Sequence, residues 1–133
     1  MKKLIALVFA MALVVAACSS STEDDVKTYC DDLGTLQTSL QALTALTAQS
    51  TMDDVNSAKE AVKSAYDATV SSASNVDDAV SSELADAQNT WQSAVDAIPS
   101  DATVETAMAT VTTADQAYLA SVNTTLDKVN CSS

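Results

Sequence analysis

Residues 26–44 read VKTYCDDLGTLQTSLQALT, and apolar side chains recur in this segment at alternating steps of three and four. Such a repeat lays one apolar stripe along an α-helix and is typical of a helix that packs against other helices. The stripe continues to residue 47 and has seven members: Val26, Tyr29, Leu33, Leu36, Leu40, Leu43 and Thr47. We therefore expect a long amphipathic helix that opens at Thr22-Glu23-Asp24-Asp25, with acids in its first turn, and ends at Gln49-Ser50.

Two more helices are expected directly after this one. The chain has one Gly and one Pro, and no later segment keeps the two-residue period of a strand. Thr51 and Asp54 resemble a capping box, with Asp in place of the usual Glu, and predict the start of a second helix. Asn75, which is followed by an apolar residue and two aspartates, predicts the start of a third helix. Pro99 predicts its end.

A fourth helix follows, and Ser100-Asp101 predicts its cap. In this helix Asp115 interrupts the apolar stripe, and we expect the buried face to shift to Ala114 at that point. The expected stripes are Val55, Ala58, Val62, Ala65 and Thr69 in the second helix; Val80, Leu84, Ala87, Trp91, Ala94 and Ile98 in the third; and Val104, Met108, Val111, Tyr118, Val122 and Val129, with Ala107, Ala114 and Leu126 alongside, in the fourth.

Four helices with short connections predict an all-α fold, an up-down-up-down four-helix bundle. The predicted number of helices depends on the connection near Ser74. If one helix continued through this connection, the fold would be a three-helix bundle. Cys30 lies near the start of the first helix and Cys131 at the end of the last. An even number of antiparallel helices brings these ends together, whereas an odd number separates them by a helix length. A disulfide spans only about 6 Å between Cα atoms, so a Cys30–Cys131 bridge requires four helices.

The first eighteen residues have the features of an export signal. Lys2 and Lys3 precede an unbroken apolar run from Leu4 to Val15, and small residues follow before Cys18. This order predicts a secretory signal peptide. The apolar run is too short for a membrane span, which needs about 20 residues.

The sequence Val15-Ala16-Ala17-Cys18 resembles the lipobox of bacterial lipoproteins, with Val15 where Leu is usual. The resemblance covers residues 1–18 only. It implies cleavage before Cys18, acylation of Cys18 and anchoring at the extracytoplasmic face of a bacterial membrane. Residues 1–17 would then be the signal peptide, 18–22 the acylated cysteine with a polar tether, and 23–133 the bundle domain. The alternative is an ordinary secretory signal with a coincidental cysteine.

With Cys18 committed to lipid, Cys30 and Cys131 remain. In an exported protein, two remaining cysteines favour a disulfide over the alternative of two buried free thiols. The helical layout between them resembles that of small exported proteins of Gram-positive bacteria, a resemblance that implies no activity. A Gram-positive surface and a periplasmic or outer-membrane location both stay open.

The charge and the missing residue types exclude several functions. After cleavage the chain keeps four Lys and all 18 acidic residues, a net charge of −14. Nucleic-acid binding needs a basic face, so nucleic acid is not expected as a partner. The chain has no His and no Arg, which removes the usual catalytic triads, imidazole metal sites and phosphate clamps. We expect no catalytic residue, no metal and no cofactor.

Four aspartate pairs are candidates for a cation site: Asp24-Asp25, Asp31-Asp32, Asp53-Asp54 and Asp77-Asp78. Three of them fall in the expected first turn of a helix, where acids offset the positive end of the helix dipole. Their spacing does not match an EF-hand. Helix capping and solubility are therefore the favoured interpretation, and a weak cation site is the alternative.

The aromatic residues Tyr29, Tyr66, Trp91 and Tyr118 fall one on each expected helix, with the three tyrosines at similar heights. They could line a pocket for a small apolar ligand, or they could fill the core of a bundle otherwise built from small residues. The sequence favours the core. Trp91 could anchor a partner only if it faced outward.

The sequence thus predicts a non-catalytic, lipid-anchored envelope protein that acts as an interaction or structural module. Its expected partners are the membrane, through acylated Cys18, and another envelope protein. The alternative function is the transport of a small apolar ligand bound between the helices.

Overall fold

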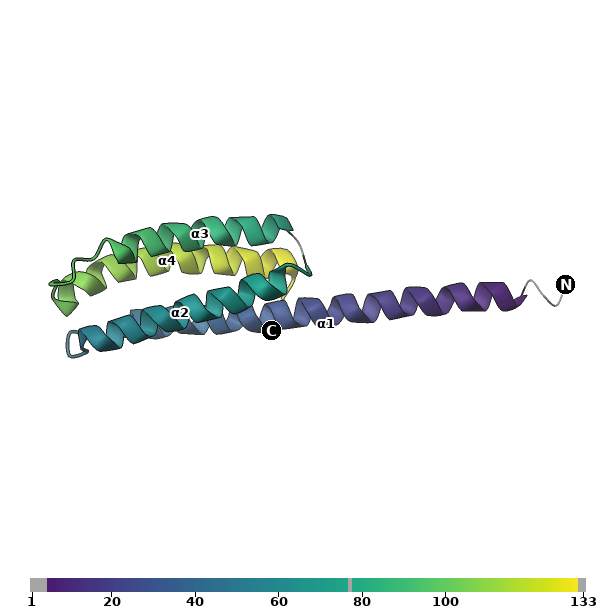
Figure 1. The fold of residues 1–133 in the computed structure, drawn as a ribbon, viewed down its shortest axis with the longest axis horizontal. Coiled ribbons are helices and arrows are strands. Elements are labelled where there is room, and N and C mark those ends of the chain that lie inside the picture. The colour runs from purple at the N-terminus through teal and green to yellow at the C-terminus, as the bar shows by residue number, and fades with distance from the viewer. Residues whose placement is uncertain (1–4, 77, 132–133) are drawn as a thin grey trace.

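A computed structural model describes residues 5–76 and 78–131 and contains four helices (Figure 1). They are α1 (Ile5–Thr44), α2 (Met52–Ala73), α3 (Asp78–Asp96) and α4 (Val104–Val129). The described residues form no strand. The all-α four-helix bundle is confirmed. The three-helix alternative is wrong, because α2 ends at Ala73 and a turn follows in which the Val76 N–H donates to the Ala73 carbonyl at 2.9 Å.

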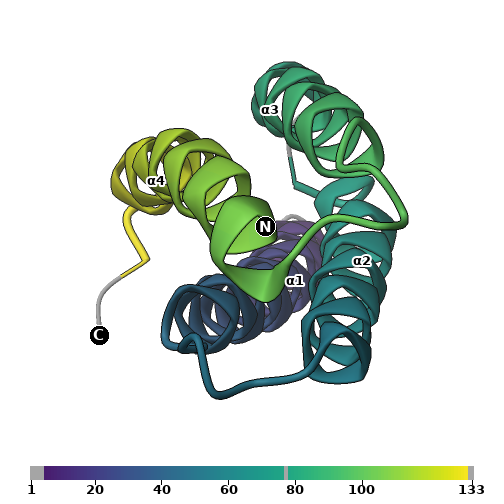
Figure 2. The same cartoon turned by 90° about the vertical axis from the view of Figure 1, so that its left-hand side faces the viewer.

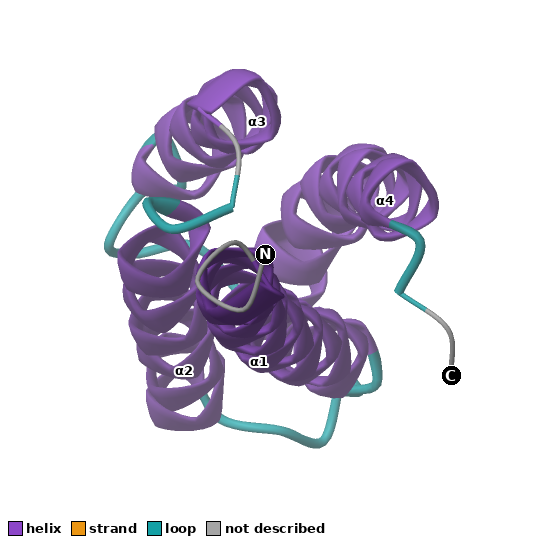
Figure 3. Cartoon of the chain, turned by 90° about the vertical axis from the view of Figure 1, so that its right-hand side faces the viewer, coloured by secondary structure: helices purple, strands orange, loops and turns teal. Residues whose placement is uncertain are grey.

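The bundle consists of two helical hairpins. The first joins α1 to α2 and the second joins α3 to α4, and α1 packs along α4 to hold the hairpins together. Contact between α2 and α3 is much less extensive than contact within either hairpin. The end-on views in Figures 2 and 3 show this arrangement, with the four helices around one core.

The stripe of α1 supplies the centre of that core. Tyr29, Leu33, Leu36, Leu40 and Leu43 are all fully buried, whereas Val26, nearer the end of the bundle, is half-buried. Side chains from the other three helices close around them: Val55, Val62, Ala65 and Ala73 from α2, Val80, Leu84, Trp91 and Val95 from α3, and Val111, Tyr118 and Val122 from α4. Burial of this apolar surface is the main force that holds the helices together.

The predicted start of the first helix at residues 22–25 is wrong, because α1 is continuous from Ile5 and extends beyond the other helices (Figure 1). The chain has no Gly or Pro before Gly34, so no residue in this segment terminates a helix. Asp24-Asp25 therefore lies within a helix and not in its first turn. No helix in the described ranges is long and apolar enough to cross a membrane.

The capping box at the start of α2 is confirmed. The Thr51 hydroxyl accepts a hydrogen bond from the Asp54 N–H at 3.1 Å, and the Asp54 carboxylate accepts one from the Thr51 N–H at 2.8 Å. The hydrogen bond from the Thr51 backbone lowers the pKa of Asp54, because it stabilises the charged form. Asp53 and Asp54 also lie where the helix dipole favours negative charge.

The Thr51→Ala variant is expected to lose about 1 kcal/mol of unfolding free energy, because the Asp54 N–H loses its acceptor. Urea denaturation followed by circular dichroism measures this loss. Thr38→Ala is the matched control, since the Thr38 hydroxyl is exposed in mid-helix and donates only to the Gly34 carbonyl. Its effect should stay within about 0.5 kcal/mol. Equal losses for both variants would contradict a capping role.

The predicted starts of the third and fourth helices are also wrong in detail. Helix α3 begins at Asp78, so Asn75 is not its cap; Asp77 lies outside the described residues. The cap of α4 is Thr103 and not Ser100-Asp101, and its hydroxyl accepts from the Thr106 N–H at 3.3 Å. Residues 99–102 form a turn in which the Ala102 N–H donates a hydrogen bond to the Pro99 carbonyl. The helix therefore begins after this turn.

Helix α4 ends with Asn130 in the left-handed conformation, φ 55° and ψ 43°, which Asn tolerates better than most residues. The Cys131 N–H then donates to the Leu126 carbonyl at 3.0 Å and turns the chain toward α1. Cys131 forms a disulfide with Cys30, with their Cα atoms 5.5 Å apart. The structure thus forms the predicted bridge, which is an independent check on the number of helices.

Candidate functional site: a groove between α3 and α4

Helices α3 and α4 enclose a groove of about 800 Å³ that is open to solvent along one side. We call it the α3–α4 groove. It is walled mainly by small side chains, with acidic residues at one end and two aromatic residues at its floor. The lining residues are Glu83, Asp86, Ala87, Thr90, Trp91 and Ala94 from α3, and Ala109, Thr110, Thr113, Ala114, Ala117, Tyr118 and Ser121 from α4.

The groove exists because α3 turns a different face to the core from the one predicted. The predicted core positions Ala87 and Ala94 are half-buried and line the groove. Their neighbours Gln88 and Val95 take the core positions instead and are 5% and 1% exposed. Val95 fills more of the core than Ala94 could, so this rotation buries the larger apolar side chain and leaves the alanines at the edge.

The groove floor is formed by Trp91 and Tyr118, whose ring centroids lie 6.1 Å apart in a tilted arrangement. Both are almost fully buried. Trp91 therefore does not project outward as a partner anchor. Burial is the main cause of a raised pKa of Tyr118, and the neighbouring Tyr66 and Tyr29 raise it further.

The structure thus brings the three tyrosines together, but only Tyr118 reaches the groove. Tyr29 is fully buried in the core, and Tyr66 is half-buried against it. The interpretation of the aromatic residues as core is confirmed for Tyr29, Trp91 and Tyr118. The α3–α4 groove lies beside the pair Trp91 and Tyr118 rather than at the centre of all four residues.

Behind the floor lies Asp115, which is fully buried. The Trp91 indole N–H donates to one carboxylate oxygen at 2.5 Å, and the Thr44 hydroxyl lies 3.1 Å from the other. The predicted shift of the buried face to Ala114 is wrong, because these two polar partners satisfy the carboxylate inside the bundle. Ala114 instead lines the groove.

Burial raises the pKa of Asp115 to about 6, although the hydrogen bonds from Trp91 and Thr44 oppose this shift. The Thr44 hydroxyl also lies 2.9 Å from the Leu40 carbonyl and has only one proton to give. A protonated Asp115 could donate to the Thr44 oxygen while Thr44 donates to Leu40, so both contacts are satisfied in the acid form.

The Asp115→Asn variant is expected to gain stability relative to the parent chain as the pH rises from about 4 to 7. The folded pKa of Asp115 is about 6 and its ordinary value is 3.8, so the folded state holds the proton more tightly. The parent chain therefore loses unfolding free energy across this pH range, on the order of 2–3 kcal/mol from this group. Asn carries no charge at any of these values and escapes that loss.

Urea denaturation of both chains at about pH 4, 5.5 and 7 measures the difference. The control is Asp67→Asn, which changes an exposed carboxylate on α2. A stability difference for Asp115→Asn that stays constant with pH, as for the control, would contradict the raised pKa.

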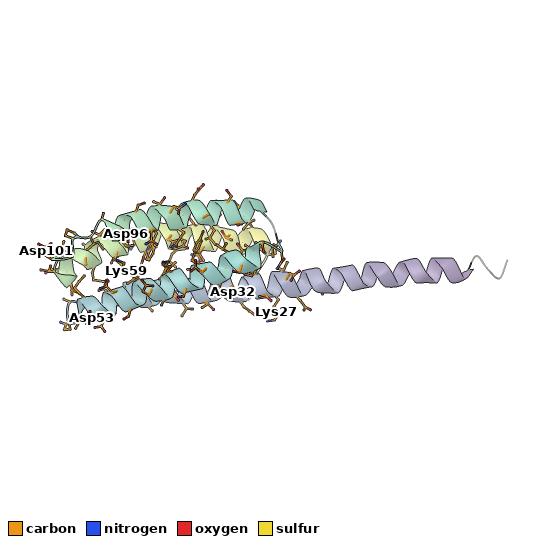
Figure 4. All side chains as sticks on the ribbon, in the orientation of Figure 1. Lys27, Asp32, Asp53, Lys59, Asp96 and Asp101 are labelled. Atoms are coloured by element: carbon orange, nitrogen blue, oxygen red, sulfur yellow. A yellow bond between two sulfur atoms is a disulfide. The ribbon has the colours of Figure 1, made fainter. Side chains whose placement is uncertain are left out.

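The pairs Asp24-Asp25, Asp31-Asp32 and Asp53-Asp54 are not among the lining residues of the groove, and Asp77 lies outside the described residues. Asp31 pairs with Lys27 at 2.7 Å, and both side chains are largely exposed. Figure 4 shows Asp32, Asp53 and Asp101 on the outside of the bundle. Among the described residues, no three acidic or cysteine side chains come together as a metal ion would require.

Comparison of the chain with models of protein families, with curated proteins and with solved structures gives no match. The α3–α4 groove and the residues that carry its charge are therefore the basis for a proposal of function.

Proposed function

We propose that this protein is a non-catalytic, lipid-anchored module of the bacterial cell envelope that binds a partner protein in the α3–α4 groove. The observation that carries the proposal is the groove itself. Two further hollows, of about 270 and 430 Å³, are smaller and more polar. Val70, at 39% exposed, is the one large apolar side chain that is exposed among the described residues. An apolar hollow on an otherwise polar surface is typical of an interaction site.

The lipid anchor is supported by the lipobox-like sequence that ends at Cys18. Glu23 lies seven residues before Cys30, about 10 Å along a helix. A tether from Cys18 would therefore enter the domain at the end closed by the disulfide. The groove runs along the side of the bundle and has its acidic end toward the disulfide, because its lining residue Glu83 pairs with Lys128, three residues before Cys131. A partner on the same membrane could reach it there.

A non-catalytic role is supported by the chemistry of the chain, which has no His and no Arg. Asp115 is the described carboxylate with a clearly raised pKa, and it does not line the groove. Both of its oxygens already have protein partners, so the carboxylate functions as a structural link between α1, α3 and α4.

The second candidate is a carrier of a small apolar ligand. A volume of about 800 Å³ is within the range of small-molecule sites. The floor of Trp91 and Tyr118 would suit a flat apolar molecule. The open side of the groove favours a protein partner, because a carrier would need to enclose most of its ligand.

Two measurements test the proposal. The intact mass of protein extracted from membranes of its native host should correspond to a chain that begins at Cys18 and carries acyl chains. A photo-reactive side chain in place of Thr113, in the groove, should cross-link to a protein in those membranes. The same side chain in place of Asp67, on the opposite hairpin, should not.

A chain without acyl groups would overturn the anchor, and equal cross-linking at both positions would overturn the groove as the binding site. Cross-linking at Thr113 to a small molecule alone would favour the carrier function.

A further inference from the structure

We infer that the occupant of the α3–α4 groove is an amphipathic helix with a cationic polar face, supplied by another protein. The inference rests on the proposed function and specifies the chemistry of the partner. It follows from the hydrogen-bonding state of the groove walls, from their charge and from the groove's length.

The groove walls present acceptors and few donors. The hydroxyls of Thr90, Thr113 and Ser121 each donate to a carbonyl of their own helix, at 2.9, 3.2 and 3.4 Å. A hydroxyl has one proton, so these groups can only accept hydrogen bonds from an occupant. At the floor, the Trp91 indole N–H is already used by Asp115. The hydroxyl of Tyr118 has no hydrogen-bond partner among the described residues, but it is buried at the floor. An occupant that brings its own donors therefore suits these walls.

The charge of the groove requires the same kind of occupant. Glu83 and Asp86 lie at one end, and no basic residue is among the lining residues. Lys128 forms an ion pair with Glu83, which leaves Asp86 exposed and available to a cation. The mature chain carries four Lys against 18 acidic residues, so a second copy of this protein would be repelled. Lys or Arg side chains of a different protein supply both the charge and the donors.

The dimensions of the groove suit a helix. Its lining runs from Glu83 to Ala94 on α3, a span of eleven residue steps or about 16 Å at 1.5 Å per residue. That length matches about three turns of a docked helix. The alanines on both walls allow a third helix to approach closely, and its apolar stripe would lie over Trp91 and Tyr118. The open side leaves the polar face of the docked helix free for solvent and for contact with Asp86.

Three helical turns bury less surface than a standard stable interface, so the isolated complex should be weak and transient. Confinement of both proteins to one membrane would raise their effective concentration and compensate for a weak contact.

The test uses the mature chain from Cys18 onward, produced without acylation, and a dye-labelled peptide of about four helical turns. The peptide carries a Leu and Ala stripe and a Lys polar face, and contains no Trp or Tyr. Fluorescence anisotropy should give micromolar binding. Because Trp91 is the only tryptophan in the chain, its emission should change over the same range of peptide concentrations. A peptide of the same composition in scrambled order, and one with Glu in place of Lys, should bind at least tenfold more weakly.

Variants of the α3–α4 groove test whether the peptide binds there. Thr90→Arg with Thr113→Arg puts two cations on the exposed walls and should weaken binding of the Lys peptide at least tenfold. Thr38→Arg with Thr124→Arg makes the same charge change at exposed positions outside the groove and should leave binding within twofold. Circular dichroism verifies that both variants keep the helical content of the parent.

Equal binding of the Lys peptide and its scrambled form, or equal loss in both double variants, would overturn the inference. A second outcome would also overturn it: a change in Trp91 emission with a small aromatic ammonium ion such as benzyltrimethylammonium, when the peptide causes no change. That outcome would identify a small-molecule site. If the peptide fails while the Thr113 cross-link to a membrane protein persists, the cationic helix is wrong and the proposed function stands.

Discussion

The Cys131→Ser variant is expected to lose about 2–5 kcal/mol of unfolding free energy. The disulfide joins residues 101 positions apart, and without it the unfolded chain gains the freedom of a long open loop. On the chain-entropy model a ring of about 100 residues contributes up to about 4.7 kcal/mol. A domain of this size has only about 5–15 kcal/mol in total, so the variant should unfold at a much lower urea concentration.

The control for this experiment is the Cys18→Ser variant, produced without acylation. It removes a cysteine that lies outside the ring and should leave the denaturation midpoint unchanged. Addition of a reductant to the parent chain should lower its stability to that of Cys131→Ser, whereas the variant should not respond. A loss below about 1 kcal/mol would show that the unfolded chain is compact enough to keep the two ends close without the bridge.

Replacement of Trp91 by alanine is expected to lower the unfolding free energy by about 3–5 kcal/mol. Trp91 is 2% exposed, packs against Tyr118 and donates the shorter of the two hydrogen bonds to buried Asp115. The substitution therefore removes apolar contacts and leaves a buried carboxylate with one partner. The variant should also raise the pKa of Asp115 further, because the indole hydrogen bond stabilises its charged form.

The Trp91→Phe variant separates these two causes, since it keeps an aromatic ring and removes the N–H. It should cost about 1–3 kcal/mol at neutral pH and less at about pH 4, where Asp115 is protonated. A double-mutant cycle with Asp115→Asn measures the coupling between the two side chains. Strictly additive losses would mean that the hydrogen bond contributes nothing to stability and that packing alone explains the role of Trp91.

Local sequence patterns predicted the parts of the fold that depend on neighbouring residues. The step of three and four that places Leu33, Leu36 and Leu40 in the core is a property of one helix, and so is the capping box of Thr51 and Asp54. The number of helices followed from the start and stop signals along the chain, and the geometry of one disulfide gave an independent check on it. In each case the physical constraint acts within a few residues or through a covalent bond, so it can be recognised without knowledge of the packing.

The groove and the position of Asp115 could not be predicted in this way. Asp115 is buried because Trp91, 24 residues before it, and Thr44, 71 residues before it, bring donors to its carboxylate. A polar residue in an apolar stripe indicates a break unless such distant partners are known. On α3, the choice between Ala87 and Gln88 as the core residue depends on how Val95 fits against the other helices, which no pattern within α3 records.

The Cys30–Cys131 bridge also determines how the domain would respond to cleavage by a protease. Every connection between the helices of the bundle lies between these two cysteines. A protease that cuts one connection therefore opens a ring and does not release a fragment. Both pieces remain joined at the end of the domain where α1 and α4 meet, and the severed helices can close around the same core again. A single cleavage would thus leave the domain nicked but whole.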